Sequence, residues 1–199
     1  MPYSSFTLTE LLDRFDLELE ERQNLFAGMT PRVPSDLLLG WLEQNVPLAL
    51  ALSTEKARSE FMIAPILAEV RRLLERRVSL FSGLEFNVDS SQGLNGECDF
   101  LFSKSPEQLL LRAPVVTVVE AKNENFKNGI AQAGAEMIAA RIFNQRREHP
   151  QEQIFGAVTT GDNWQFLKLV GQRLFVDSER YDLDNVPQIL GILCQMLEP

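Results

Sequence analysis

A carboxylate and an amine lie two residues apart at the end of one apolar run, PVVTVVEAK, residues 114–122. The run is nearly all β-branched, which is typical of a central strand covered on both faces. Alternation along such a strand predicts that Val116, Val118, Glu120 and Lys122 share one face. A solvated ion pair is the simplest interpretation of an E-x-K tripeptide, but a charge without a purpose is costly at the end of a buried strand.

A second carboxylate, Asp99, precedes this pair in the stretch GECDFLFS. The 20 residues between Asp99 and Glu120 suffice for a strand, a turn and a neighbouring strand. We therefore expect Asp99, Glu120 and Lys122 to meet at one end of a sheet. Satisfying turn amides is the alternative role for Asp99. Alternation also predicts that Asp99 lies on the opposite face of its strand from Cys98, Phe100 and Phe102.

The elements that position these residues follow from periodicity and from capping residues. We predict helices over 7–15, over 34–52 with a break near Pro47, over 53–77 with Ser53 as cap and a kink or restart at Pro65, over 128–148 and over 185–197, and strands over 84–89, 97–103, 114–122, 153–161 and 164–178, the last divided by a turn at Gly171. This order implies one α/β sandwich with helices on a mixed sheet, preceded by a helical extension over residues 1–52.

The composition excludes several classes of function. No apolar run is long enough to span a bilayer, and the N-terminus has no signal-peptide pattern, so we expect a cytoplasmic protein with no membrane partner. Cys98 and Cys194 form no CxxC motif and are expected to be buried, and the single histidine, His149, lies in a polar stretch. Chemistry that needs a histidine base is therefore disfavoured.

The formal net charge of −9 weakens a nucleic-acid assignment. However, residues 61–155 carry 12 acids and 11 bases, so the excess of acid lies in the flanks. A divalent cation held by some of the central acids would make the potential of this region positive. The acidity of the chain is therefore compatible with a DNA partner.

Together these residues resemble the PD-(D/E)XK nuclease superfamily over roughly residues 53–176, by Asp99, by Glu120-Ala121-Lys122 and by the order of elements. The resemblance implies a restriction-endonuclease-like three-layer α/β sandwich over residues 53–199. Two departures from the family pattern are Cys98 in place of proline and Glu136 in place of the tyrosine of some exonuclease branches. The second speaks against that exonuclease branch, and within the resemblance we expect an endonuclease.

The resemblance also implies a mechanism, in which Asp99, Glu120 and the Ala121 carbonyl hold one or two Mg²⁺ or Mn²⁺ ions. Lys122 would then position the attacking water or stabilise the developing negative charge. The upstream helical acid is Glu60 or Glu69, and nine residues at about 100° each place them on nearly opposite sides of a helix. We favour Glu60 as a metal ligand, because a carboxylate among apolar residues before Pro65 is more similar to the acid of the family's first helix.

Two polar residues of the predicted helix 128–148, Gln132 and Glu136, lie one turn apart. We predict that Gln132 reaches the site and that Glu136 does not.

Three functions stay open at this point. The first is a metal-dependent DNA nuclease. The second is a catalytically silent nuclease-fold protein that serves in binding or regulation. The third is an interaction protein, a homodimer joined through the first 50 residues and the apolar final helix.

Overall fold

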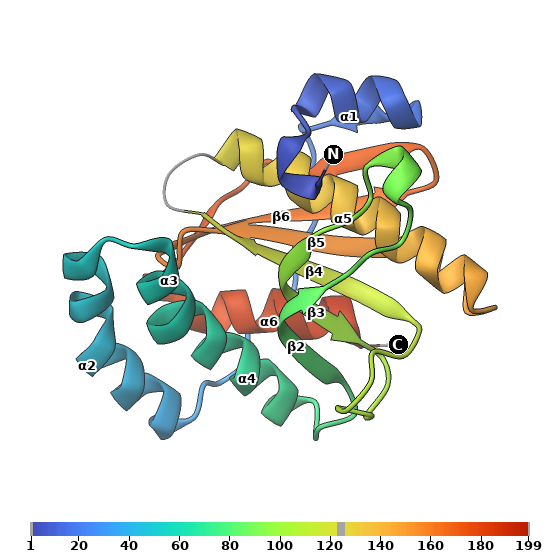
Figure 1. The fold of residues 1–199 in the computed structure, drawn as a ribbon. Coiled ribbons are helices and arrows are strands. Elements are labelled where there is room, and N and C mark those ends of the chain that lie inside the picture. Colours follow the sequence, from blue (N-terminus) through green and yellow to red (C-terminus); the bar gives the residue numbers. More distant parts are fainter. Residues whose placement is uncertain (1, 123–125, 199) are drawn as a thin grey trace.

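The computed structural model describes residues 2–122 and 126–198. These residues form an eight-stranded sheet in the order β1-β7-β6-β5-β4-β3-β2, with β8 paired to β6. The β4–β5 and β1–β7 pairs are parallel and the other pairs are antiparallel. Helices cover both faces, with α5 on one side and α4 and α6 on the other (Figure 1). The predicted α/β sandwich around a mixed sheet is confirmed.

The helices and strands are, in chain order, α1 (Leu8–Phe15), β1 (Glu18–Glu20), α2 (Asp36–Leu52), α3 (Glu55–Arg58), a π-helical turn (Ser59–Ile63), α4 (Ala64–Leu73), β2 (Ser79–Glu85), β3 (Glu97–Ser103), β4 (Val115–Ala121), α5 (Phe126–Arg146), β5 (Gln153–Thr159), β6 (Asn163–Val170), β7 (Arg173–Val176), β8 (Tyr181–Asp182) and α6 (Val186–Leu197). The predicted hairpin forms between β2 and β3, although its first strand begins five residues earlier than expected. Gly171 lies between β6 and β7, as predicted.

Two hydrophobic cores flank the sheet. One lies between the sheet and α2, α4 and α6, and the other lies between the sheet and α1 and α5. Every residue of β4 is buried, because this strand is central and covered on both faces. Small residues bring α5 close to the sheet: a Cβ on Gly129 would lie 2.5 Å from Cγ1 of Val158 on β5. The end of β4 and the first half of α5 therefore meet in a narrow space.

Strict alternation fails in two places, and both change the predicted faces. Phe102 pairs with Thr117 while Ser103 pairs with Val115, so Val116 is an extra residue. Val116 packs in the core of α4 and α6, whereas Val118 packs in the core of α5, so the prediction that these two valines share a face was wrong.

The second irregularity is at Gly83 on β2, which lies across from Asp99 and has a φ of 61°. Alternation along β2 breaks at this glycine, since Phe81 and Leu84 pack in the same core. The faces of β3 change at the same level of the sheet. Cys98 packs in the α5 core, while Phe100 and Phe102 pack in the opposite core. The expectation that all three share one face of β3 was therefore wrong. Cys98 and Cys194 are both buried and free, as predicted.

The N-terminal helices differ from the prediction in detail. α2 continues through Pro47 to Leu52, so the expected break is absent within this described helix, because Leu38, Leu42 and Ala49 stay buried. Ser53 ends α2 in a left-handed conformation, and Thr54 rather than Ser53 caps α3. The restart expected near Pro65 is confirmed, since a π-helical turn gives way to α4 at Ala64.

The first 52 residues and the final helix are both integrated into the fold. β1 pairs with β7, and Leu11 of α1 is fully buried in the α5 core, so the predicted helical extension also supplies a strand. Nine residues of helix α6 are buried. The final helix is therefore part of the core, and the expectation that it contributes to a dimer interface stays a prediction.

Candidate active site

The two predicted metal-ligand carboxylates lie on neighbouring strands. Phe100 of β3 pairs with Val119 of β4. Because the two strands are antiparallel, Asp99, which comes before Phe100, and Glu120, which comes after Val119, lie beside each other. The Oδ2 atom of Asp99 accepts a hydrogen bond from the backbone N–H of Ala121 at 2.8 Å. This bond continues the pairing of the strands past their last paired residues and fixes the Asp99 carboxylate at the end of the sheet.

Lys122 follows β4 directly, and its backbone N–H donates to the Thr159 carbonyl of β5 at 2.8 Å. Its ammonium group donates to Oε1 of Glu120. A Cβ on Gly129 would lie 3.1 Å from Cγ of Lys122, so the first turn of α5 packs against the lysine stem. The meeting of Asp99, Glu120 and Lys122 that the spacing suggested is thus found at the carboxyl end of β4.

Helix α5 adds a third carboxylate that the sequence prediction left out. Glu136 is fully buried, and its Oε1 atom accepts a hydrogen bond from Nε2 of Gln132 at 3.3 Å. Gln132 therefore reaches the site by holding Glu136. The signal in the sequence was a lone acid within the small, apolar run AQAGAEMIAA, residues 131–140, all of which are buried.

Burial and neighbouring negative charge raise the pKa of the two glutamates of this cluster. Burial, and then the charges of Glu136 and Asp99, raise the pKa of Glu120 well above its usual value, and Lys122 opposes this shift. Burial also raises the pKa of Glu136, and the hydrogen bond from Gln132 only partly offsets it. Both carboxyls are therefore easier to protonate than an exposed glutamate.

The environment of Lys122 keeps its amine charged. Burial alone would lower the pKa of Lys122, but Glu120, and then Glu55 and Asp99, raise it above its usual value. Glu55 begins α3, so an acid of the first helices does act on the site electrostatically. The sequence prediction did not include this residue.

The two upstream acids that the sequence offered lie elsewhere. The Glu60 side chain is 55% exposed and pairs with Lys56 at 3.4 Å. Glu69 is buried, but it accepts hydrogen bonds from the Ser35 backbone and the Arg72 guanidinium. Within the described ranges no contact joins Glu60 to the cluster of Asp99, Glu120 and Lys122, and its role as a ligand stays a prediction.

One further cation lies at the same end of the sheet. Arg58 donates to the Thr160 carbonyl at 2.7 Å and to Oδ1 of Asp162 at 2.8 Å. Thr160 comes just after the Thr159 carbonyl that binds Lys122. By contrast, two arginines near the C-terminal end of α5 lie away from the site, which is at the first half of this helix. Arg141 donates to the Gly171 carbonyl, and Arg146 donates to the Val88 carbonyl and to Asp89.

The donor set at the end of β4 fits a small hard cation. The Oε2 atoms of Glu120 and Glu136 are buried, and among the described residues neither has a hydrogen-bond partner. Such oxygens are costly to leave unsatisfied, and a divalent cation is one partner that satisfies them. The described part of the chain contains no group of three or more His, Cys, Asp and Glu side chains placed to hold a metal. A Mg²⁺ ion, however, commonly uses one or two carboxylates, and Asp99 and Glu120 supply two.

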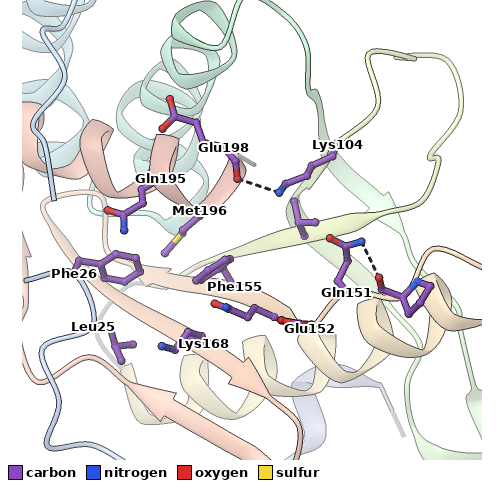
Figure 2. A pocket seen from close by; sticks show the side chains of 13 residues that line it. Leu25, Phe26, Lys104, Gln151, Glu152, Phe155, Lys168, Gln195, Met196 and Glu198 are labelled. Atoms are coloured by element: carbon purple, nitrogen blue, oxygen red, sulfur yellow. Dashed lines mark hydrogen bonds between the residues drawn. The ribbon is translucent and has the colours of Figure 1, made fainter.

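A separate hollow of about 600 Å³ lies where β4 and β5 begin, against the end of α6 (Figure 2). Phe26, Phe155 and Met196 form its apolar part, and Lys104 is held by the Glu198 carbonyl at 3.1 Å. Its lining mixes two lysines with two glutamates and three glutamine amides. It shares no lining residue with the carboxylate cluster, which lies where the same two strands end.

Comparisons of the chain with known protein families, curated proteins and solved structures gave no match. Among the described residues no helix has the length and apolar content needed to cross a membrane.

Proposed function

We propose that this protein is a cytoplasmic, divalent-metal-dependent nuclease that hydrolyses phosphodiester bonds of DNA as an endonuclease. The observation that supports the proposal most is the buried Oε2 atom of Glu120, which has no hydrogen-bond partner among the described residues. The Glu120 carboxyl is also close enough to Asp99, Glu136 and Lys122 for their charges to act on its pKa. A restriction-endonuclease-like arrangement of the α/β sandwich is part of the same proposal.

The carboxylates of Asp99 and Glu120 and the carbonyl of Ala121 would hold the cation. When bound, Mg²⁺ or Mn²⁺ would activate a water and neutralise negative charge on the phosphate. Binding would also favour the ionised form of Glu120, since a cation compensates the burial that raises the pKa of this carboxyl.

Lys122 acts on the reacting groups directly in this proposal. Its ammonium contacts Glu120 and keeps its charge, so it is placed to orient the attacking water or to stabilise the negative charge that develops on the phosphate. Gln132 has a positioning role, because its amide holds one oxygen of Glu136 in place. Burial between β4 and α5 keeps water from screening these interactions.

The first experiment is cleavage of supercoiled DNA, single-stranded DNA and RNA by the purified chain with Mg²⁺ or Mn²⁺. The matched variants are Lys122→Ala and Asp99→Ala in the site, and Glu69→Gln, a buried glutamate on the far side of the sheet, as control. We expect metal-dependent cleavage of DNA that both site variants abolish and the control retains. Cleavage that survives in the site variants would come from a contaminant and would contradict the proposal.

Calorimetric titration with Mn²⁺ separates the active enzyme from a catalytically silent protein of the same fold. The nuclease is supported if the native chain binds Mn²⁺ and cleaves DNA, and if Glu120→Gln loses both the binding and the cleavage. Binding of Mn²⁺ and DNA without cleavage of any substrate form would favour the silent binding protein. Absence of Mn²⁺ binding would contradict the nuclease and would also favour the silent protein.

A further inference from the structure

Helix α2 exposes an apolar stripe that its own chain does not cover. Leu38, Leu42 and Ala49 face the core. A neighbouring side of the same helix presents four large apolar side chains, here called the α2 flank, with exposed fractions of 82% for Leu37, 42% for Trp41, 45% for Leu48 and 51% for Leu52. At 100° per residue these four positions fall within 60° of one another. Single exposed leucines are ordinary on a protein surface, but a continuous stripe of this kind indicates a binding surface.

The α2 flank borders a groove of about 550 Å³ between α2 and α4. Leu37 and Trp41 line one wall, Pro65 and Ala68 line the other, and three arginines, Arg71, Arg72 and Arg76, lie at one end. The indole N–H of Trp41 donates to the Phe61 carbonyl at 3.0 Å, which fixes the ring over the groove. The groove is therefore preformed and wide enough to receive apolar side chains of a helix.

The four apolar positions of the α2 flank are spaced symmetrically about the middle of the helix. Leu37 and Leu52 are equally far from the midpoint between Gln44 and Asn45, and so are Trp41 and Leu48. Two copies of α2 that lie antiparallel about a two-fold axis at this midpoint would pair Leu37 with Leu52 of the second copy and Trp41 with its Leu48. A two-fold interface needs a surface that is complementary to itself, and the α2 flank has this property.

The charges at the two ends of the helix agree with the same arrangement. The last turn of α2 carries no basic residue, so the negative end of its dipole is uncompensated within its own helix. Ser35 binds Glu69, and Trp41 binds Phe61, so α2 and α4 run antiparallel and the three groove arginines lie beside the start of α2. The two-fold axis brings the end of α2 in the second copy to these arginines.

The composition of α2 argues against other occupants. The helix contains Asp36 and Glu43 and no lysine or arginine. Helices that lie on anionic membranes carry lysine and arginine on their polar face, and nucleic acids need the same cations. We propose that this protein forms a two-fold homodimer through antiparallel α2 helices, with the α2 flank of each copy in the α2–α4 groove of the other.

Sedimentation equilibrium of the full chain over a wide concentration range tests the dimer. Two exposed leucines of α2 provide a matched pair of variants: Leu48 is on the α2 flank, and Leu50, with an exposed fraction of 39%, lies 200° around the helix from it. We expect a dimer for the native chain and for Leu50→Glu. For Leu48→Glu we expect a dimer dissociation constant raised about 100-fold or more, because a charge is buried twice in the interface. Both leucines are partly exposed, so both variants should keep the monomer fold, which circular dichroism checks.

A cysteine at the proposed axis gives a second measurement. Gln44→Cys should form a disulfide-linked dimer under mild oxidation, whereas the exposed Ser178→Cys should not, and the native Cys98 and Cys194 are buried and do not compete. A native chain that is monomeric at all concentrations, or equal weakening of the dimer by Leu48→Glu and Leu50→Glu, would overturn the proposal.

Discussion

Two buried glutamates on helices, Glu69 of α4 and Glu136 of α5, lie in opposite electrostatic surroundings. Glu69 accepts two hydrogen bonds from Arg72 and one from the Ser35 backbone, and the bonds to Arg72 lower its pKa against the effect of burial. Glu136 has one neutral donor, Gln132, and one oxygen that lacks a hydrogen-bond partner among the described residues. Its pKa is raised, because burial dominates.

The difference distinguishes a structural carboxylate, whose oxygens are all hydrogen-bonded within the protein, from a carboxylate with an oxygen that can bind a ligand. A buried acid whose oxygens are all used connects elements, as Glu69 connects α2 to α4. A buried acid that faces other acids lowers stability, and this cost is easiest to explain where a cation offsets it. The same contrast separates Glu69 from Glu120, whose Oε2 atom also lacks a partner in the part of the chain that the structure describes.

The largest expected effect concerns the cation. A metal at about 100 times its dissociation constant should stabilise the native chain by about 2.7 kcal/mol, which raises Tm by about 5 °C or more. Thermal unfolding in Mn²⁺ should show this gain for the native chain and for Glu69→Gln, but not for Glu120→Gln. An equal gain in stability for the native chain and both variants would mean that Glu120 does not bind the cation. Glu120 and Glu69 would then not differ in ligand binding.

Replacing Glu136 by glutamine should stabilise the metal-free protein by about 2 kcal/mol at pH 8, because folding no longer has to bury a carboxyl that is ionised in the unfolded chain. Its folded pKa of about 8 lies above the unfolded value of 4.5, so the native chain loses stability as pH rises between these values, and the variant should not. Urea unfolding at pH 4.5, 6 and 8 measures the difference. A variant that is destabilised equally at every pH would show that Glu136 serves packing alone.

Replacing Glu69 by alanine should destabilise the protein by about 1–2 kcal/mol at pH 7, since the Ser35 N–H and Arg72 lose their acceptor. The pH dependence has the opposite sign: the folded pKa is lowered, so this stability is present above pH 4.5 and is lost as pH falls below it. Urea unfolding of Glu69→Ala and of the exposed control Glu60→Ala checks this. Equal effects of the two substitutions would place Glu69 among ordinary surface acids.

The smallest effect separates packing at the site from packing elsewhere on α5. A Cβ on Gly129 would meet Val158 at 2.5 Å and Lys122 at 3.1 Å, and one on Gly134 would meet Leu11 at 2.6 Å. Both alanine variants should lose about 1 kcal/mol of stability. Only Gly129→Ala should also reduce Mn²⁺-dependent cleavage, because it displaces the Lys122 stem. A similar loss of cleavage in both would show that activity follows stability.

Local signals predicted most of the elements and the meeting of Asp99, Glu120 and Lys122, because β-branched runs, capping residues and chain length between strands are encoded nearby in the sequence. The same signals misplaced Cys98 and Val116, since alternation breaks beside Asp99 in β3 and at an extra residue in β4, and neither irregularity shows in the pattern of residue types. They also set aside Glu136, because helical spacing shows that it neighbours Gln132 and cannot show that α5 turns this side toward β4.

The sequence by itself determined which residues carry charge at the ends of buried strands, and hence the chemistry that this end of the sheet offers. Only the tertiary structure decided which acids share that site. Glu60, Glu69 and Glu136 are acids in helical segments with apolar neighbours, and burial and hydrogen bonding sort them into a surface ion pair, a connection between helices and a member of the carboxylate cluster. The physical reason is that the free energy of a carboxylate depends on its partners and on the water that it loses, and both are set by packing between distant segments.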